Sequence, residues 1–183
     1  MTSRLIAAVL VGAVVLTSSC GSDEDKPLTD AQGQWVDAFC GGLVPGMKAG
    51  VELKAQDPAN PAAVKTAYLK LVTANATALA GAEKKLKELG PPSDELKDVH
   101  ERLMKYVSES ARSYAAAQAP VEKLEPDARF WENAEKTLAD TSQVSSPEEL
   151  RATFDALEKS PKYAAAIGKS VPCGELKSGG QRQ

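Results

Sequence analysis

Two long stretches of the chain place an apolar residue at every third or fourth position, and a short proline-rich break separates them. The first stretch covers residues 61–89 and the second covers residues 96–121. This spacing puts the apolar side chains of each stretch on one face of an α-helix. The Gly-Pro-Pro sequence at residues 90–92 ends the first helix, and Ser93 can cap the second. Because so few residues separate them, we predict that the two helices form an antiparallel hairpin.

Shorter helices are predicted on both sides of this hairpin. Thr29 and Gln32 have the spacing of a capping box, so a helix begins there. Its pattern is interrupted by glycines and Pro45, so we expect it to end near Gly42 or to break there before a second piece over residues 47–54. Pro120 is expected to bend or end the second hairpin helix. The remaining predicted helices cover residues 127–141, 147–157 and 161–167, the last one being ended by Gly168.

The composition supports a helical interior. Only nine of the 183 residues are aromatic, and alanine is abundant, which suits helices that approach one another closely. A helix with one apolar stripe must bury it against another element. We therefore predict an all-α fold, an antiparallel bundle of four main helices plus short helices. The bundle domain is expected to span residues 29–177, and residues 178–183 are expected to be a disordered tail.

The N-terminus has the parts of a secretory signal peptide over residues 1–19. Arg4 supplies the positive charge, and residues 5–16 form an uninterrupted apolar run. The uncharged sequence continues only to Ser22, which is short for a membrane span of roughly 20 residues. An uncleaved membrane anchor is therefore the alternative to cleavage. We expect the protein to be exported.

The segment LTSSCG, residues 16–21, resembles the lipobox of bacterial lipoproteins. In such proteins signal peptidase II cuts before a cysteine that carries a diacylglyceryl thioether, and the resemblance assigns that role to Cys20. Thr17 stands where the lipobox usually has leucine. An ordinary secretory cut next to Cys20, which would release the protein, is the competing interpretation. Residues 20–28 include three consecutive acidic residues and are expected to be a solvated tether.

The cysteine count favours lipidation. Three thiols in an oxidising compartment leave one unpaired unless another reaction consumes it. If Cys20 carries the lipid, Cys40 and Cys173 remain as an even pair, and a disulfide between them would join the two ends of the domain. Two independent buried thiols are the alternative.

Charge and motifs argue against several classes of function. Removing residues 1–19 removes one basic and no acidic residue, so 21 basic and 25 acidic residues remain and the formal net charge becomes −4. Nucleic acid is therefore not an expected partner, because phosphate binding needs clustered Lys and Arg. His100 is the only histidine and lies beside an apolar seam, where a partly buried structural role is the usual one. We predict no catalytic residues, no metal site and no cofactor.

The adjacent aromatic residues Phe130 and Trp131 are the candidate contact with a partner or ligand. Neighbouring positions on a helix differ by about 100°, so one of the two rings can be partly exposed. An exposed ring would form a docking spot for a partner protein or the lip of an apolar pocket. The alternative, which we favour on sequence alone, is that one broad buried stripe absorbs both rings.

Taken together, the lipobox-like segment, WVDAFC at residues 35–40 and VPCGEL at residues 171–176 resemble the small helical lipoproteins of Gram-positive, especially actinobacterial, cell envelopes. The resemblance implies a location on the extracytoplasmic face of the membrane more than it implies an activity. Our leading hypothesis is a membrane-anchored, non-enzymatic binding module for an unknown protein or small apolar ligand. The alternatives are a carrier of an apolar small molecule or lipid between the helices, and an enzyme of unknown class.

Overall fold

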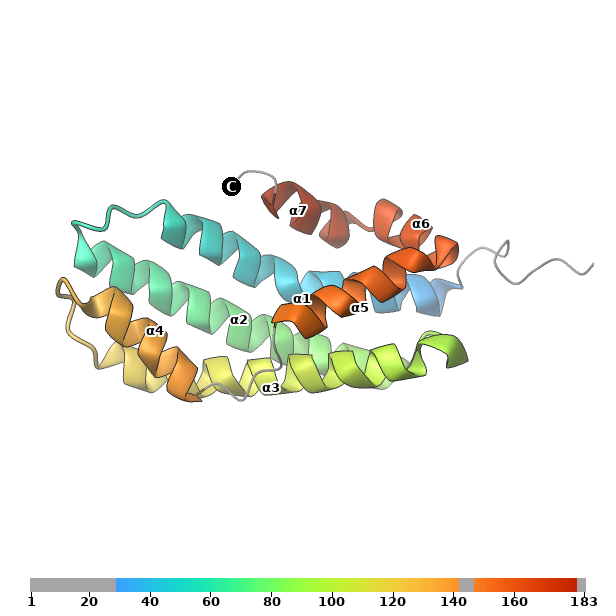
Figure 1. The fold of residues 1–183 in the computed structure, drawn as a ribbon, viewed down its shortest axis with the longest axis horizontal. Coiled ribbons are helices and arrows are strands. Elements are labelled where there is room, and N and C mark those ends of the chain that lie inside the picture. Colours follow the sequence, from blue (N-terminus) through green and yellow to red (C-terminus); the bar gives the residue numbers. More distant parts are fainter. Residues whose placement is uncertain (1–28, 142–146, 181–183) are drawn as a thin grey trace, which may run out of the picture.

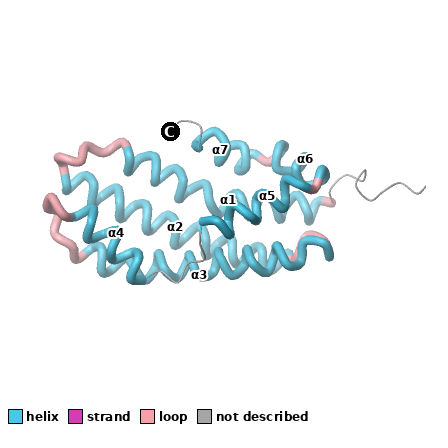
Figure 2. The backbone as a smooth tube through the Cα atoms, viewed as in Figure 1, coloured by secondary structure: helices cyan, strands magenta, loops and turns pink. Residues whose placement is uncertain are grey.

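The structure is a computed structural model that describes residues 29–141 and 147–180. Within these ranges the chain forms α-helices joined by short connections, and no strand is present (Figures 1 and 2). The predicted all-α fold is confirmed. The elements in chain order are α1 (Asp30–Lys54), α2 (Pro61–Leu89), the 3-10 turn η2 (Asp94–Leu96), α3 (Lys97–Glu122), α4 (Phe130–Thr141), α5 (Pro147–Lys159), α6 (Pro161–Lys169) and α7 (Val171–Gly180).

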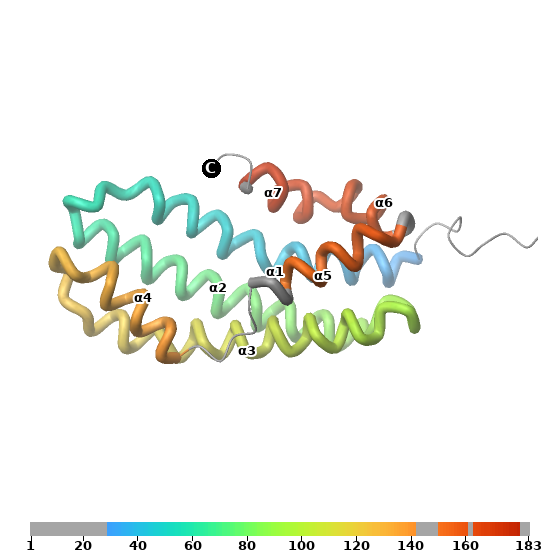
Figure 3. Tube along the Cα trace, in the orientation of Figure 1, coloured from blue at the N-terminus to red at the C-terminus, as the bar shows by residue number. Residues whose placement is uncertain are grey.

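The three longest helices, α1, α2 and α3, form the body of an antiparallel bundle. The α2–α3 pair is the predicted hairpin, and α1 packs along α2 (Figure 1). The fourth position of the bundle is divided between shorter helices. At the end where α1 connects to α2, α4 packs on α2 and α3, while α5 packs on α3 in the other half. The last two helices, α6 and α7, lie on α1 (Figure 3).

The ends of the long helices follow the signals that the sequence carries. The Thr29 side chain accepts a hydrogen bond from the Gln32 backbone N–H at 3.3 Å, and the Gln32 side chain accepts one from the Thr29 N–H at 3.0 Å. This is the predicted capping box. At the start of α2, the Asn60 side chain accepts from the Ala63 N–H at 3.2 Å. Gly90 follows α2 with a φ of 68°, a left-handed conformation that favours glycine.

The prediction that the first helix ends or breaks near Gly42 is wrong, because α1 is continuous through Pro45 to Lys54. The physical reason is the close approach of α1 to α2. A Cβ atom on Gly42 would lie 2.4 Å from the Cβ of Ala82, and one on Gly46 would lie 2.0 Å from Oδ1 of Asn75. These glycines let α1 and α2 pack closely. The resulting tertiary contacts outweigh the low intrinsic helix propensity of glycine.

Replacing Gly42 with alanine is expected to destabilise the fold by about 1 to 3 kcal/mol, because the added methyl group overlaps Ala82 on a neighbouring helix. The matched control is Gly41→Ala, since nothing lies within 4 Å of a Cβ at that position. The control should be neutral or stabilising by up to about 1 kcal/mol, because alanine favours the helix. Urea denaturation of the two variants measures the difference. Equal effects would contradict the close packing of α1 on α2.

The helical part of the chain continues further toward the C-terminus than predicted. The helix expected to be last, α6, ends at Lys169, and a further helix, α7, then runs to Gly180. Residues 178–180 were expected to belong to a disordered tail, and this boundary is therefore wrong. Gly179 lies against α1, since a Cβ there would be 2.2 Å from the Met47 sulfur. Residues 181–183 lie outside the described residues, as do the predicted signal peptide and tether.

The buried side chains form two apolar clusters along the bundle. The larger cluster contains Trp35, Phe39, Leu103 and the disulfide, and draws on all the helices except α4. The smaller cluster lies at the other end of the bundle, and its largest members are Tyr68 and Phe130. Both clusters also contain alanines, as expected for helices that approach closely.

Cys40 and Cys173 form the predicted disulfide. Their Cα atoms are 5.0 Å apart, and both residues are buried in the larger apolar cluster. The bond joins α1 to α7 across 133 positions of sequence and so ties the first helix to the last one described. The alternative of two independent buried thiols is excluded.

Candidate functional site

An apolar pocket of about 330 Å³ lies at the end of the bundle where α1 meets α2 and α3 meets α4. It opens to solvent between the α1–α2 and α3–α4 connections, which lie side by side at the end opposite the start of α1 (Figure 1). The six large apolar residues of its lining outnumber the three polar ones. The lining residues are Leu53, Lys54, Gln56, Pro58, Pro61, Val64, Asp127, Ala128, Phe130 and Trp131.

The two aromatic residues singled out in the sequence have different environments. Phe130 is buried, with 1% of its surface exposed, whereas Trp131 keeps 48% exposed and forms part of the pocket wall. The favoured expectation that a buried stripe absorbs both rings is therefore wrong for Trp131. Each ring lies nearly perpendicular to Tyr68, with ring centroids 6.0 Å apart and interplanar angles of 85° and 87°. Tyr68 thus packs against both aromatic rings of the pocket wall.

Tyr68 is itself held in place by a polar contact. Its hydroxyl donates a hydrogen bond to Oε1 of Glu135, one turn beyond Trp131 on α4, at 3.2 Å. Burial raises the pKa of Tyr68 well above its ordinary value, and the neighbouring Glu135 carboxylate raises it further. The phenol therefore stays protonated and keeps donating. This bond fixes the tyrosine ring against which Phe130 and Trp131 pack.

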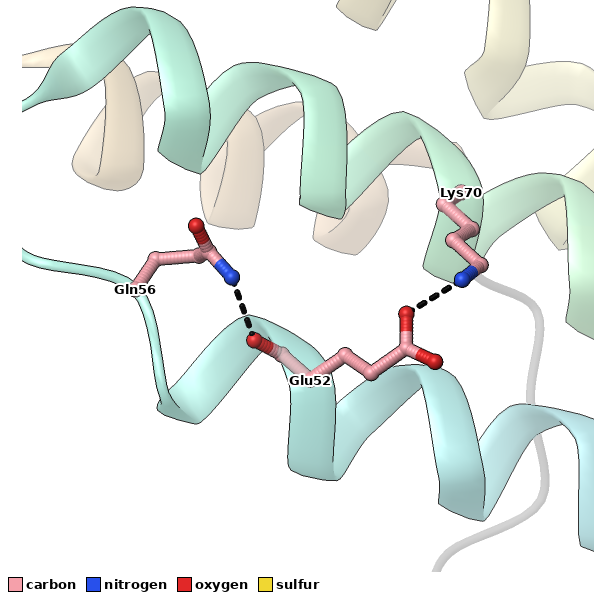
Figure 4. Close-up of polar contacts among 3 residues, drawn as sticks. All are labelled: Glu52, Gln56 and Lys70. Carbon is pink, nitrogen blue, oxygen red and sulfur yellow. Dashed lines mark hydrogen bonds and ion pairs between the residues drawn. The ribbon is translucent and has the colours of Figure 1, made fainter.

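Hydrogen bonds also fix the α1–α2 connection, which forms one side of the pocket. The Gln56 side chain donates to the backbone carbonyl of Glu52 at 2.8 Å, and the Glu52 carboxylate pairs with Lys70 of α2 (Figure 4). Further along, the Asp57 side chain accepts from the Ala59 N–H at 2.9 Å. Gln56 therefore ties the connection to α1, and the Glu52–Lys70 pair joins α1 to α2 beside it.

The α3–α4 connection, on the other side, is held in the same way. Lys65 of α2 donates to the backbone carbonyls of Glu122 and Leu124, at 2.8 Å and 2.6 Å. Asp127 accepts from the Arg129 N–H at 2.8 Å through its side chain, and from the Phe130 N–H at 3.0 Å through its backbone carbonyl. Hydrogen bonds thus hold the connections on both sides of the pocket.

The single histidine lies far from this pocket, among the first turns of α1 and α3. His100 is 8% exposed, and its Nδ1 accepts a hydrogen bond from the indole N–H of Trp35 at 3.0 Å. An indole nitrogen can only donate, so Nδ1 carries no proton and the neutral ring is protonated at Nε2. Burial lowers the pKa of His100, against a smaller opposing effect of Glu101. Protonation of Nδ1 would break the bond to Trp35.

The stability of the fold is expected to fall as the pH decreases below about 6.5, the ordinary histidine value. The pKa of His100 is lower in the folded than in the unfolded state, so the unfolded chain binds more protons in the interval between the two values. Stability is then fully present above the unfolded-state pKa and is lost as the pH falls toward the folded-state pKa. Urea denaturation at pH 7.5 and pH 5.5 measures the loss.

His100→Asn is the control for this pH dependence. Its side-chain oxygen can accept the Trp35 N–H where Nδ1 does, and it does not titrate. The variant should lose the pH dependence between 7.5 and 5.5. An equal loss of stability in the variant would show that groups other than His100 cause it.

Potential metal ligands do not cluster in residues 29–141 and 147–180. This part of the chain contains no group of three or more His, Cys, Asp or Glu side chains that could hold a metal ion. Of the candidate residues, Phe130 and Trp131 lie at the pocket, Cys40 and Cys173 form the disulfide, and Cys20 lies outside the described residues.

Comparison with protein-family models, curated proteins and solved structures finds no match to this chain. Of the helices that the structure describes, none has both the length and the apolar character needed to cross a bilayer.

Proposed function

We propose that the protein is a lipid-anchored, extracytoplasmic binding module that uses the pocket beside Trp131. The proposal of an anchor rests on the N-terminal sequence. The signal-peptide pattern of residues 1–19 and the lipobox-like segment around Cys20 together favour export and acylation. Two or more acyl chains would hold the protein stably at a membrane, where one would bind only marginally.

The position of the pocket suits such an anchor. The tether would leave the bundle at the start of α1, and the pocket lies at the opposite end (Figure 1). The 25 residues of α1 span about 37 Å at 1.5 Å per residue. A bundle standing on its tether would therefore present the pocket away from the lipid surface, where a ligand or partner can reach it.

The observation that carries the binding role is the exposure of Trp131. A tryptophan with 48% of its surface exposed, on the wall of an apolar pocket, is costly to leave in water and is a residue type enriched at binding hot spots. Its ring packs edge-to-face against Tyr68. These features support recognition through an apolar contact.

Two measurements test the proposal. The mass of the intact chain extracted from membranes of its native host should lack residues 1–19 and carry a diacylglyceryl group, whereas Cys20→Ala should carry none. A photoreactive benzoylphenylalanine at position 131 should form adducts in the same cells, and one at position 171 should not. Val171 is the matched control because it is 73% exposed but lies on α7, outside the pocket. An unprocessed chain would overturn the anchor, and equal adducts at the two positions would overturn the binding role.

A further inference from the structure

We infer that the pocket binds a small, flat, uncharged aromatic molecule about the size of two fused rings. This inference rests on the proposed function, because it names the ligand class for the same pocket. It is carried by the volume of the pocket, its lining, the arrangement of its aromatic walls and the hydrogen bonds that hold its loops.

The volume sets the size of the ligand. A cavity of about 150 Å³ lined by aliphatic and aromatic side chains is known to accept benzene. The pocket measures about 330 Å³, roughly twice that volume, and stands near the lower limit for pockets that hold small molecules. A two-ring compound fits this space, whereas a helix of a partner protein needs a longer groove.

The lining sets the charge of the ligand. Lys54 and Asp127 contribute one positive and one negative formal charge, so the lining as a whole is neutral. The Asp127 carboxylate already accepts a hydrogen bond from its own connection. Burial of an unpaired charge among the remaining apolar side chains would be strongly unfavourable. A neutral ligand with at most one polar group, directed toward the rim, meets these conditions.

The aromatic walls favour a flat ligand over a saturated one. Phe130 and Trp131 are both perpendicular to Tyr68, and Trp131 has its unburied surface available to a further ring. Aromatic pairs in offset or edge-to-face arrangements gain energy beyond that of area burial. A planar ligand can form such a pair with Trp131, and a puckered ring of the same size cannot.

The restrained loops reduce the conformational entropy that is lost when a ligand binds. Pro58 and Pro61 restrict the α1–α2 connection, and the bonds made by Gln56 and Lys65 hold the two sides of the pocket. A site formed before binding loses little conformational freedom when it is filled, so even a small ligand can bind measurably.

Photolabelling of the full-length chain in phosphatidylcholine vesicles tests the inference. If the mass measurement shows no acyl chain, the same chain is used in buffer. The label is 3-trifluoromethyl-3-phenyldiazirine, a small uncharged aromatic carbene precursor. After the Cys40–Cys173 disulfide has been reduced, the labelled protein is digested with trypsin. Trypsin cuts after Arg129 and Lys136, so the peptide 130–136 reports the pocket, while peptide 170–177 contains the exposed Val171 and serves as the internal control.

The competitors form a matched series. 2-Naphthol is expected to protect peptide 130–136 from labelling and to leave peptide 170–177 unaffected. Decahydro-2-naphthol, the saturated analogue, should need an about three- to tenfold higher concentration because it lacks the aromatic pairing. 2-Naphthoate and 2-(aminomethyl)naphthalene, which carry opposite charges, should each need at least about tenfold more.

Two variants connect protection to the pocket. Ala128→Phe fills the space from an exposed position, and Trp131→Ala removes the aromatic wall. Protection by 2-naphthol should be lost in both. The inference would be overturned if 2-naphthol failed to protect the wild-type peptide, or if it protected both variants as well as the wild type. It would also be overturned if the saturated or charged analogues protected the peptide at the same concentrations as 2-naphthol. If adducts still form specifically at position 131 in cells, the binding role survives and only the ligand class is wrong.

Discussion

Replacing Cys40 and Cys173 together with alanine is expected to lower the free energy of unfolding by about 5 kcal/mol. The disulfide closes a loop of 133 positions, and in the chain-entropy model a loop of that length restricts the unfolded chain by about this amount. This is a large fraction of the stability of a small domain, commonly 5 to 15 kcal/mol. Urea denaturation followed by circular dichroism measures the change.

The matched control is the wild-type protein in the presence of a reductant. Reduction opens the same loop but keeps both sulfur atoms in the apolar cluster that surrounds Cys40 and Cys173. It should reproduce most of the loss, and the double variant should not respond to the reductant. A loss below about 1 kcal/mol in both samples would contradict a loop-closing role for the bond.

The sequence predicted the long helices well because their signals are local. The capping residues Thr29 and Asn60, the proline at position 61 and the stop at Gly90 all act within one or two turns of the helix ends. Periodic apolar residues then define the buried faces without reference to any other part of the chain. The disulfide was predicted from the cysteine count, on the hypothesis that Cys20 carries the lipid and leaves Cys40 and Cys173 as a pair.

The errors arise where distant parts of the chain decide the local structure. Gly42 and Gly46 resemble helix stops in isolation, but α2 packs so close to α1 at both positions that a Cβ atom would overlap Ala82 or Asn75. The helix α7 contains Pro172 and three glycines, a composition with low helix propensity. Its disulfide to α1 and the contact of Gly179 with Met47 supply the tertiary packing that local propensity lacks.

The candidate site was predicted only in part for the same reason. The neighbouring rings of Phe130 and Trp131 were identified because adjacent helix positions face different directions. The opposite wall, which includes Leu53, Pro58 and Val64, lies more than sixty positions earlier in the chain. No local pattern joins these segments, since the pairing depends on how α4 packs against α2.

Replacement of Phe130 with alanine is expected to destabilise the fold much more than replacement of Trp131. Phe130→Ala should cost about 3 to 5 kcal/mol of stability, because the ring is 1% exposed and its removal leaves a cavity in the smaller apolar cluster. Trp131→Ala should cost only about 1 to 2 kcal/mol, since it loses one edge-to-face contact with Tyr68 and half of its surface is already in water. Thermal and urea denaturation measure both.

The two alanine variants compare the loss of a buried ring with the loss of an exposed ring at neighbouring positions. They therefore distinguish a role in folding from a role in ligand binding. Trp131→Ala should remain folded and lose ligand protection at the pocket, while its far-ultraviolet circular dichroism stays that of the wild type. Phe130→Leu, which keeps most of the buried volume, should cost less stability than Phe130→Ala. Equal destabilisation by Phe130→Ala and Trp131→Ala would mean that Trp131 is a core residue. In that case its exposure would no longer argue for a binding surface.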